Sequence, residues 1–216
     1  MNQFFLRLAF FMLTISFSTL GFSQAMQKGD VTIEPYYGFP NFGKHFAGLA
    51  APEDINVTGL GPWGVRMGFL PTESFSITFD FIHNSFGDNY TEVYTEWDED
   101  DNLITQEYIH RVRMNRYRFL VGFNYHFEID TETDAYIGFA GGSNRRIESL
   151  DPGGDPNVEP INDEVAISPV AFRLRLGGRY FFTPNVAGSV ELGLGGPLVS
   201  LGIIIRPFNS SYHYDE

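Results

Sequence analysis

Apolar and polar side chains alternate with a period of two along most of the chain beyond residue 29. This period is typical of β-strands, in which successive side chains point to opposite faces of a sheet. The alternation predicts eight strands, over residues 30–39, 61–70, 74–84, 115–127, 135–143, 168–182, 186–194 and 198–208. An even number of strands suits a closed antiparallel barrel, so the predicted fold class is all-β, an eight-stranded up-and-down barrel.

The connections between the predicted strands alternate in length. Long and short connections follow one another in the order 40–59, 71–73, 85–108, 128–134, 146–164 and 183–185. Membrane barrels have short periplasmic turns and longer extracellular loops, so this order predicts that both chain ends lie in the periplasm. The last turn, 195–197, is an exception because it is short on the long-loop side. We expect the long connections 85–108 and 146–164 to be mobile and surface-exposed.

Each predicted strand has one apolar face and one face that is polar or small. We predict that ten ionisable side chains of the polar face form one ionic network: Glu34, Arg66, Asp80, Arg116, Arg118, Arg173, Arg175, Arg179, Glu191 and Arg206. A soluble barrel or sandwich would bury the apolar face and expose these groups, whereas a membrane barrel would do the reverse.

Four features favour the membrane barrel over the soluble one. The chain has only two lysines, an export signal precedes the strands, and the connections alternate in length. Aromatic side chains also gather where the strands would cross the two membrane interfaces, as in the aromatic girdles of known membrane barrels. The predicted girdle residues are Trp63, Phe69, Phe75, Tyr117, Tyr125, Phe127, Tyr180 and Phe182.

The arginines of the predicted network decide which face lies inside. An arginine that faces lipid at the bilayer midplane costs about 2–4 kcal/mol, and seven of them would exceed the roughly 5–15 kcal/mol by which a domain is stable. They must therefore face the interior, which in an eight-stranded barrel is just wide enough for side chains to fill. We predict an ionic plug in which each acid contacts an arginine, with Arg118 and Arg175 as central partners because they lie mid-strand.

The N-terminus has the layout of a secretory signal peptide. Arg7 is followed by an uncharged apolar run over residues 8–22, which is shorter than the about 20 residues of a transmembrane helix. Cleavage is expected after Ala25, with cleavage after Ser23 as the alternative. The predicted organisation is a cleaved signal peptide over 1–25, a barrel over 26–208 and a C-terminal tail over 209–216.

The composition disfavours several classes of function. A net charge of −13 disfavours nucleic-acid binding, which requires a basic surface. The absence of cysteine excludes disulfides, thiolate metal sites, a cysteine nucleophile and a lipoprotein anchor.

Three stretches with this pattern, residues 64–69, 117–123 and 174–180, together with the strand architecture, resemble the small OmpA/OmpX-type outer-membrane barrels, a porin-like group. The resemblance covers residues 26–208. It implies a monomer in the cell outer membrane, surrounded by outer-membrane lipids and lipopolysaccharide and inserted by the barrel-assembly machinery. Members of this group usually end on an aromatic residue that the machinery reads, and either Phe208 or Tyr214 could serve as that signal here.

We find no catalytic pattern in the sequence. A lipid A deacylase of this barrel size would carry a His-x-Ser pair, whereas the corresponding stretch here is His126-Phe127-Glu128, so His126 is predicted to be a hydrogen-bonded interior residue. The acidic run 98–102 has Leu103 where a calcium loop needs glycine. The remaining histidines lack partners at metal-ligand spacing; they are His45, His83, His110 and His213.

Two classes of function therefore remain, and no cofactor or metal is predicted for either. The first is a non-enzymatic barrel that acts in envelope integrity or in surface contact with an unknown partner. The alternative is an outer-membrane lipid-modifying enzyme whose site the sequence does not reveal. The sequence favours the first class because no set of catalytic residues is recognisable in it.

Overall fold

The computed structural model describes residues 26–50, 56–97, 102–165 and 168–208. Within these residues the chain forms one helix and ten strands: β1 (Val31–Phe39), α2 (Phe42–Ala50), β2 (Asn56–Thr58), β3 (Trp63–Thr72), β4 (Phe75–Trp97), β5 (Leu103–Glu128), β6 (Thr133–Asp151), β7 (Ile161–Glu164), β8 (Val170–Thr183), β9 (Val186–Leu194) and β10 (Val199–Phe208). The predicted signal peptide, 1–25, and the predicted tail, 209–216, lie outside the described residues.

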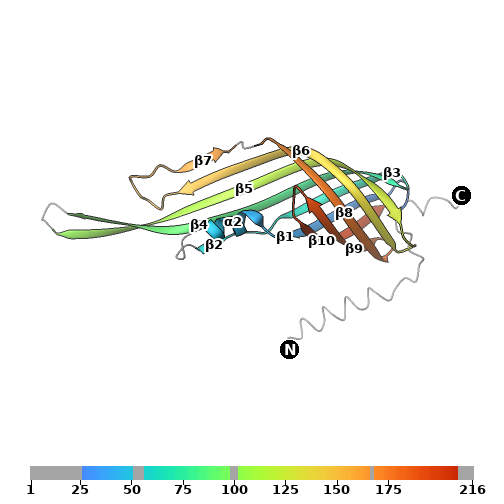
Figure 1. Ribbon diagram of the computed structural model, residues 1–216, viewed down its shortest axis with the longest axis horizontal. Coiled ribbons are helices and arrows are strands. Elements are labelled where there is room, and N and C mark those ends of the chain that lie inside the picture. Colours follow the sequence, from blue (N-terminus) through green and yellow to red (C-terminus); the bar gives the residue numbers. More distant parts are fainter. Residues whose placement is uncertain (1–25, 51–55, 98–101, 166–167, 209–216) are drawn as a thin grey trace, which may run out of the picture.

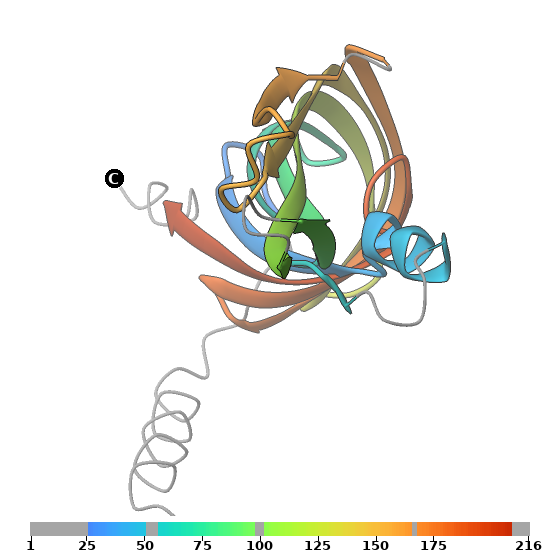
Figure 2. The same ribbon diagram turned by 90° about the vertical axis from the view of Figure 1, so that its left-hand side faces the viewer.

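Eight of these strands close into an antiparallel barrel. Neighbours in the order β1, β3, β4, β5, β6, β8, β9 and β10 pair with each other, and β10 pairs back with β1. The closing register places Tyr37 opposite Leu201 and Phe39 opposite Val199. Figure 2 looks into the ring that results. The predicted up-and-down barrel of eight strands is confirmed.

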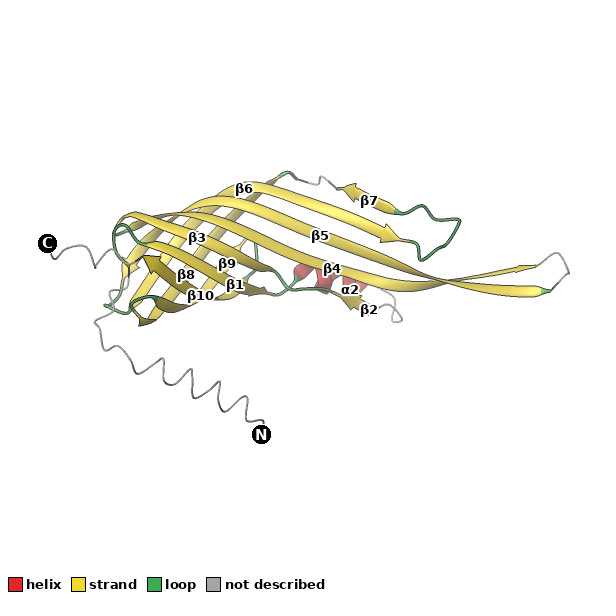
Figure 3. Cartoon of the chain, turned by 180° about the vertical axis from the view of Figure 1, so that it is seen from behind, coloured by secondary structure: helices red, strands yellow, loops and turns green. Residues whose placement is uncertain are grey.

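Three strands are much longer than predicted, and the interpretation of residues 85–108 and 146–164 as loops is wrong for most of their length. Strands β4 and β5 stay in register from the barrel out to Trp97 opposite Leu103, and β6 follows β5 as far as Asp151. The polar and acidic composition of these residues suggested loops, but aromatic and β-branched side chains still recur along them, and these favour strands. The three strands project well beyond the barrel as a ribbon (Figures 1 and 3).

Short elements flank this projecting ribbon. Strand β2 pairs with β4, and β7 pairs with β6. Helix α2 lies in the predicted connection 40–59 and begins after Asn41, whose side-chain oxygen accepts a hydrogen bond from the backbone N–H of Lys44 at 3.2 Å. This is a helix N-cap. We call the end of the barrel from which the ribbon projects the outer mouth, and the opposite end the inner mouth.

The outer face of the barrel wall is apolar and its inner face is polar, the reverse of a soluble protein. Large apolar side chains such as Phe79 and Phe172 are about 60% exposed on the outside, whereas Arg66, Arg173 and Glu191 are buried inside. An apolar outer belt with a polar interior is the arrangement of a transmembrane barrel. Among the described residues, no helix is long and apolar enough to cross a bilayer.

Candidate functional site

Arg66 is the centre of a buried ion-pair network inside the barrel. Its guanidinium contacts three carboxylates, Glu34 at 3.3 Å, Asp80 at 3.2 Å and Glu191 at 2.7 Å. The three acids come from β1, β4 and β9, so one arginine on β3 connects strands from different parts of the barrel wall. Each of the four side chains is at most 4% exposed, and buried charges of this kind are tolerated only when they are paired and hydrogen-bonded.

Four further arginines extend the network toward both mouths. Their ion pairs are Arg173–Glu191, Arg175–Asp80, Arg179–Glu34, Arg179–Asp134 and Arg206–Asp30. Two of these acids, Asp30 and Asp134, were not among the predicted members. Asp134 lies just before the predicted strand 135–143, whereas Asp30 begins the predicted strand 30–39 on the same face as Glu34, so the alternation contained the signal for Asp30.

Two tyrosines complete the hydrogen bonding of the acids. The Tyr36 hydroxyl donates to Asp80 at 2.6 Å, and the Tyr136 hydroxyl donates to Glu191 at 2.7 Å. Tyr36 shares its face of β1 with Glu34, so the period of two contained the signal that it points inward. Residue type alone does not place Tyr36 inside, because a tyrosine is compatible with either face.

The prediction that Arg118 is a central partner is wrong. Arg118 makes no ion pair with a described carboxylate, and its Nη1 donates to the backbone carbonyl of Gly195 at 3.1 Å. Arg116 is half-buried and donates to Asn144 at 2.7 Å. Arg118 lies near the middle of β5, but β5 extends so far beyond the barrel wall that this position is at the outer mouth and not at the centre of the lumen. Arg175 does contact Asp80, at 3.5 Å, and also donates hydrogen bonds to Asn124 and Thr78.

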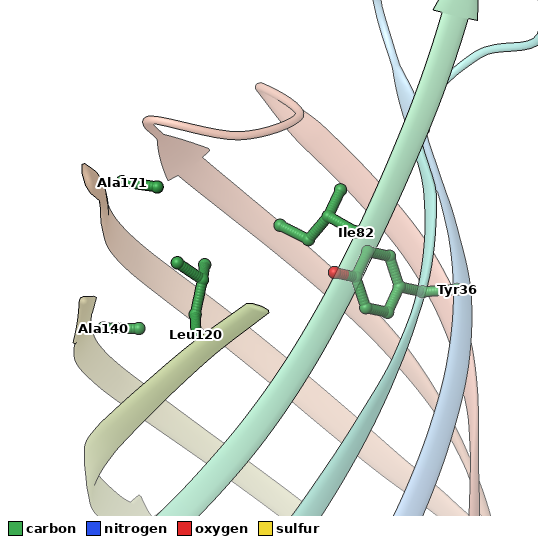
Figure 4. Close-up of a cluster of buried hydrophobic side chains, with 5 residues drawn as sticks. All are labelled: Tyr36, Ile82, Leu120, Ala140 and Ala171. Carbon is green, nitrogen blue, oxygen red and sulfur yellow. The ribbon is translucent and has the colours of Figure 1, made fainter. Parts of the chain in front are cut away.

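Two apolar clusters lie along the lumen beside the ionic network. Toward the outer mouth lies a cluster of buried side chains from five strands, Tyr36, Ile82, Leu120, Ala140 and Ala171, whose side chains point into the interior (Figure 4). Toward the inner mouth lies a second cluster of Phe181, Ala187 and Ile204, with the Arg206 guanidinium 4.4 Å from the Phe181 ring centre. Described side chains therefore fill the lumen from wall to wall over several layers.

The predicted girdle residues lie on the outer face, where the structure leaves them exposed or half-buried. Toward the outer mouth, the His83 ring lies between Trp63, at 5.6 Å, and Tyr117, at 4.8 Å between ring centres. Toward the inner mouth, pairs of aromatic rings contact each other: Phe75 with Phe123, Tyr125 with Phe127, and Tyr180 with Phe182. Phe69 is exposed on β3 on the same outer face.

A serine, a histidine and an aspartate form a hydrogen-bonded chain near the inner mouth. The Ser76 hydroxyl lies 2.8 Å from Nε2 of His126, and Nδ1 of His126 lies 2.9 Å from Asp134. This order of groups matches that of a hydrolase triad. The three residues come from three strands and share no motif, so the sequence alone does not reveal this chain. All three are at most 5% exposed.

One group on the projecting ribbon could hold a divalent cation. Nε2 of His110 lies 3.2 Å from Asp155 and 3.6 Å from Glu92, and the three ligand atoms lie within 4.8 Å of one another. No partner for His110 was recognisable in the sequence, because Asp155 is 45 residues away and contacts it only in the folded chain. Three protein ligands can bind zinc and leave a fourth position open.

Burial and hydrogen bonding shift the pKa values of Asp155 and of the neighbouring Tyr94. Burial raises the pKa of Asp155. Hydrogen bonds from the Asn157 backbone N–H, Tyr94 and His110 lower this pKa by more than burial raises it, so the pKa lies below its ordinary value. Burial, and then the hydrogen bond to Asp155, raise the pKa of Tyr94 to about 12. Asp155 therefore holds the segment after β6 against His110 and Tyr94 of the ribbon.

Together, the closed barrel, its apolar belt and its ionic interior define a transmembrane β-barrel. No protein family and no curated protein matches the chain. Solved structures that are similar include a de novo designed transmembrane β-barrel, with 10% identity and a TM-score of 0.46 over 85% of this chain and 99% of that one.

Two bacterial structures are also similar. The N-terminal β-barrel domain of Pseudomonas aeruginosa OprF has 13% identity and a TM-score of 0.43, over 83% of this chain and 98% of that one. The attachment invasion locus protein Ail of Yersinia pestis, in complex with the heparin analogue sucrose octasulfate, has 9% identity and a TM-score of 0.42, over 82% and 95%. These similarities concern the fold alone.

Proposed function

We propose that the protein is a non-enzymatic barrel of the outer membrane that seals its own lumen and presents a β-ribbon at the cell surface for contact, contributing to envelope integrity. The observation that carries the proposal is the ribbon of β4, β5 and β6, which continues far beyond the barrel wall. A structure whose only task was to span the bilayer needs strands of about 9–11 residues, whereas β4 and β5 have 23 and 26.

Apolar side chains on the ribbon support a contact role. Val93, Trp97, Leu103 and Ile109 are 49–69% exposed on strands that lie outside the barrel wall. Exposed apolar surface of this kind marks sites of interaction. Because the ribbon is paired along its whole described length, it presents these side chains on a defined framework.

Because side chains fill the lumen, we do not expect the barrel to act as a channel. Eight-stranded barrels leave room for side chains and not for a channel, and here buried arginines and acids are packed beside two apolar clusters. In planar bilayers we expect the purified protein to show no large, stable conductance. Porin-like conductance steps from the wild-type protein would contradict the proposal.

Surface contact can be tested on whole cells. Replacing Val93, Trp97 and Leu103 by serine should reduce adhesion of cells that display the protein to polystyrene. The matched control replaces Thr91, Thr95 and Thr105, which lie on the same strands, by serine, and should leave adhesion unchanged. Surface levels of each variant are measured with an epitope tag. Equal adhesion of both variants would contradict the contact role of the apolar side chains.

The Ser76–His126–Asp134 chain is the specific observation that favours a second candidate, a lipid-modifying hydrolase. Ser76 is 1% exposed, and Asn124 also donates a hydrogen bond to its hydroxyl at 3.1 Å, so an acyl carbonyl cannot reach the serine without rearrangement of the lumen. We expect no labelling by a fluorophosphonate probe. Labelling that disappears in Ser76→Ala, together with release of fatty acid from outer-membrane lipid, would establish the hydrolase instead.

A further inference from the structure

Beyond the sealed lumen and the ribbon, the outer mouth contains a cavity lined by positive charge. Its volume is about 380 Å³, and its walls include Arg116 and Arg118 of β5 and Arg146 of β6. Among the described residues that line it there is no aspartate or glutamate. None of the three arginines makes an ion pair with a carboxylate in the part of the chain that the structure describes, in contrast to the arginines of the network below them.

The three arginines are held close together on the inner face of the wall. Arg116 stands directly opposite Arg146 in the register of β5 and β6, and Arg118 is the next inward residue along β5. Like charges directly opposite each other on neighbouring strands destabilise a sheet. An arrangement that brings them together without an acid is stabilised when an anion lies between them.

Arg118 offers a donor that the protein itself does not use. Its side chain is more than nine-tenths buried, and its Nε has no hydrogen-bond partner among the described residues. Leaving such a buried donor unsatisfied costs about 1–3 kcal/mol. The first turn of α2 also faces the cavity through Phe42 and Gly43, and the backbone N–H groups of a first helical turn have no partners within the helix.

The cavity adjoins the ionic network, since Arg173 approaches Gly196 of the cavity wall, but an apolar layer lies between most of the two. On β5, Leu120 lies between Arg118 and the deeper Asn124, and on β4, Ile82 lies between Asn84 and the deeper Asp80. Both apolar side chains belong to the cluster of Figure 4. The acids below this layer make their ion pairs with Arg66, Arg173 and Arg175, and within the described residues none of them pairs with an arginine of the cavity.

We propose that the outer mouth binds a phosphate ester, whose oxyanion lies between Arg116, Arg118 and Arg146. Guanidinium groups bind such oxyanions through paired, charge-assisted hydrogen bonds. The cavity is several times larger than one water-sized site of about 30 Å³, so it accommodates the organic part of an ester as well as its oxyanion. Soluble sugar phosphates and phosphorylated glycolipids share this chemistry.

Calorimetry on the whole mature protein in a non-ionic detergent tests the proposal. The probes are glucose 6-phosphate, inorganic phosphate and glucose. We expect glucose 6-phosphate to bind, glucose to give no heat, and Arg118→Gln or Arg146→Gln to weaken binding roughly tenfold or more, since one hydrogen bond to a charged group is worth about 1.5–3 kcal/mol. Titration with micelles of phosphorylated lipid A distinguishes a glycolipid ligand from a soluble one.

The matched control is Arg111→Gln. Arg111 lies on the same strand and its loss changes the net charge equally, but it is exposed and pairs with Asp151 at 3.0 Å, so affinity should change less than about twofold. Ligand-induced thermal stabilisation is the second measurement and should vanish in Arg146→Gln while that variant still folds. Failure of all phosphorylated probes to bind, or equal loss in Arg111→Gln, would overturn the proposal without affecting the sealed-barrel function.

Discussion

Both terminal nitrogens of Arg66 donate to the carboxylate of Glu191, from Nη1 to Oε2 at 2.7 Å and from Nη2 to Oε1 at 3.1 Å. The two residues are 125 positions apart in the chain, and they join β3 to β9 through the interior. Paired hydrogen bonds between a guanidinium and a carboxylate are among the strongest side-chain contacts. The barrel is therefore held together across its lumen as well as around its wall.

Removing the charge of Glu191 should destabilise the barrel strongly. Glu191→Gln leaves Arg66 and Arg173 buried with too little negative charge, and breaking a buried pair costs about 3–5 kcal/mol. Urea unfolding in lipid vesicles, followed by tryptophan fluorescence, measures the change. The control is Glu164→Gln, which removes the exposed pair with Arg145 and should cost less than about 1 kcal/mol. Equal effects of the two substitutions would show that the network is not what stabilises the fold.

Two adjacent glycines of β6 should respond differently to alanine. A methyl group on Gly142 would meet the backbone carbonyl of Phe119 on β5, whereas one on Gly141 would lie 3.6 Å from the Phe172 ring, an ordinary contact. Gly142→Ala should therefore destabilise by about 1–3 kcal/mol, and Gly141→Ala should be neutral or slightly stabilising. The same unfolding assay compares them. Similar stabilities would mean that β5 and β6 can separate at this point without cost.

Because the chain has no cysteine, single cysteines can report its orientation in the membrane. Glu73 lies in a short turn at the inner mouth, and Glu159 lies between β6 and β7 at the outer end; both are exposed. A membrane-impermeant maleimide added to intact cells should label Glu159→Cys and leave Glu73→Cys unlabelled until the cells are lysed. The reverse pattern would invert the proposed topology.

The segment that follows β6 should loosen in acid. Because the folded-state pKa of Asp155 is lowered, its carboxylate stabilises the fold at pH values above its ordinary pKa of about 3.9. That contribution disappears as the pH falls through the lowered folded-state value. Hydrogen exchange at the amides of Asn157 and Val158, corrected for the intrinsic rate, should therefore rise below about pH 4.

Two variants check the cause of this acid response. Asp155→Asn should exchange rapidly at every pH, because it lacks the carboxylate that accepts from Asn157 and His110. Asp163→Asn, an exposed residue of β7, should behave like the wild type. If exchange in the wild type were independent of pH, Asp155 would not hold the segment.

The sequence determined which face of each strand lies inside, because a period of two assigns every second side chain to the same face. Once Arg66 is placed, Gly64 and Gly68 follow on its face and Val65 and Met67 on the other. Because arginine is unfavourable in lipid, the polar face must then be the one that lines the interior. The strand number and the closed, up-and-down topology followed from the number of alternating segments and their connections.

The tertiary structure alone decided how far the strands extend and which side chains meet. Strand pairing can stabilise polar residues such as those of 88–96 as β-structure, so composition did not reveal that β4 and β5 continue beyond the wall. The partners of Arg66, the Ser76–His126–Asp134 chain and the unpaired Arg118 depend on strand tilt and on relative height inside the barrel. The alternation fixes the direction of a side chain but not its height, and therefore not its partners.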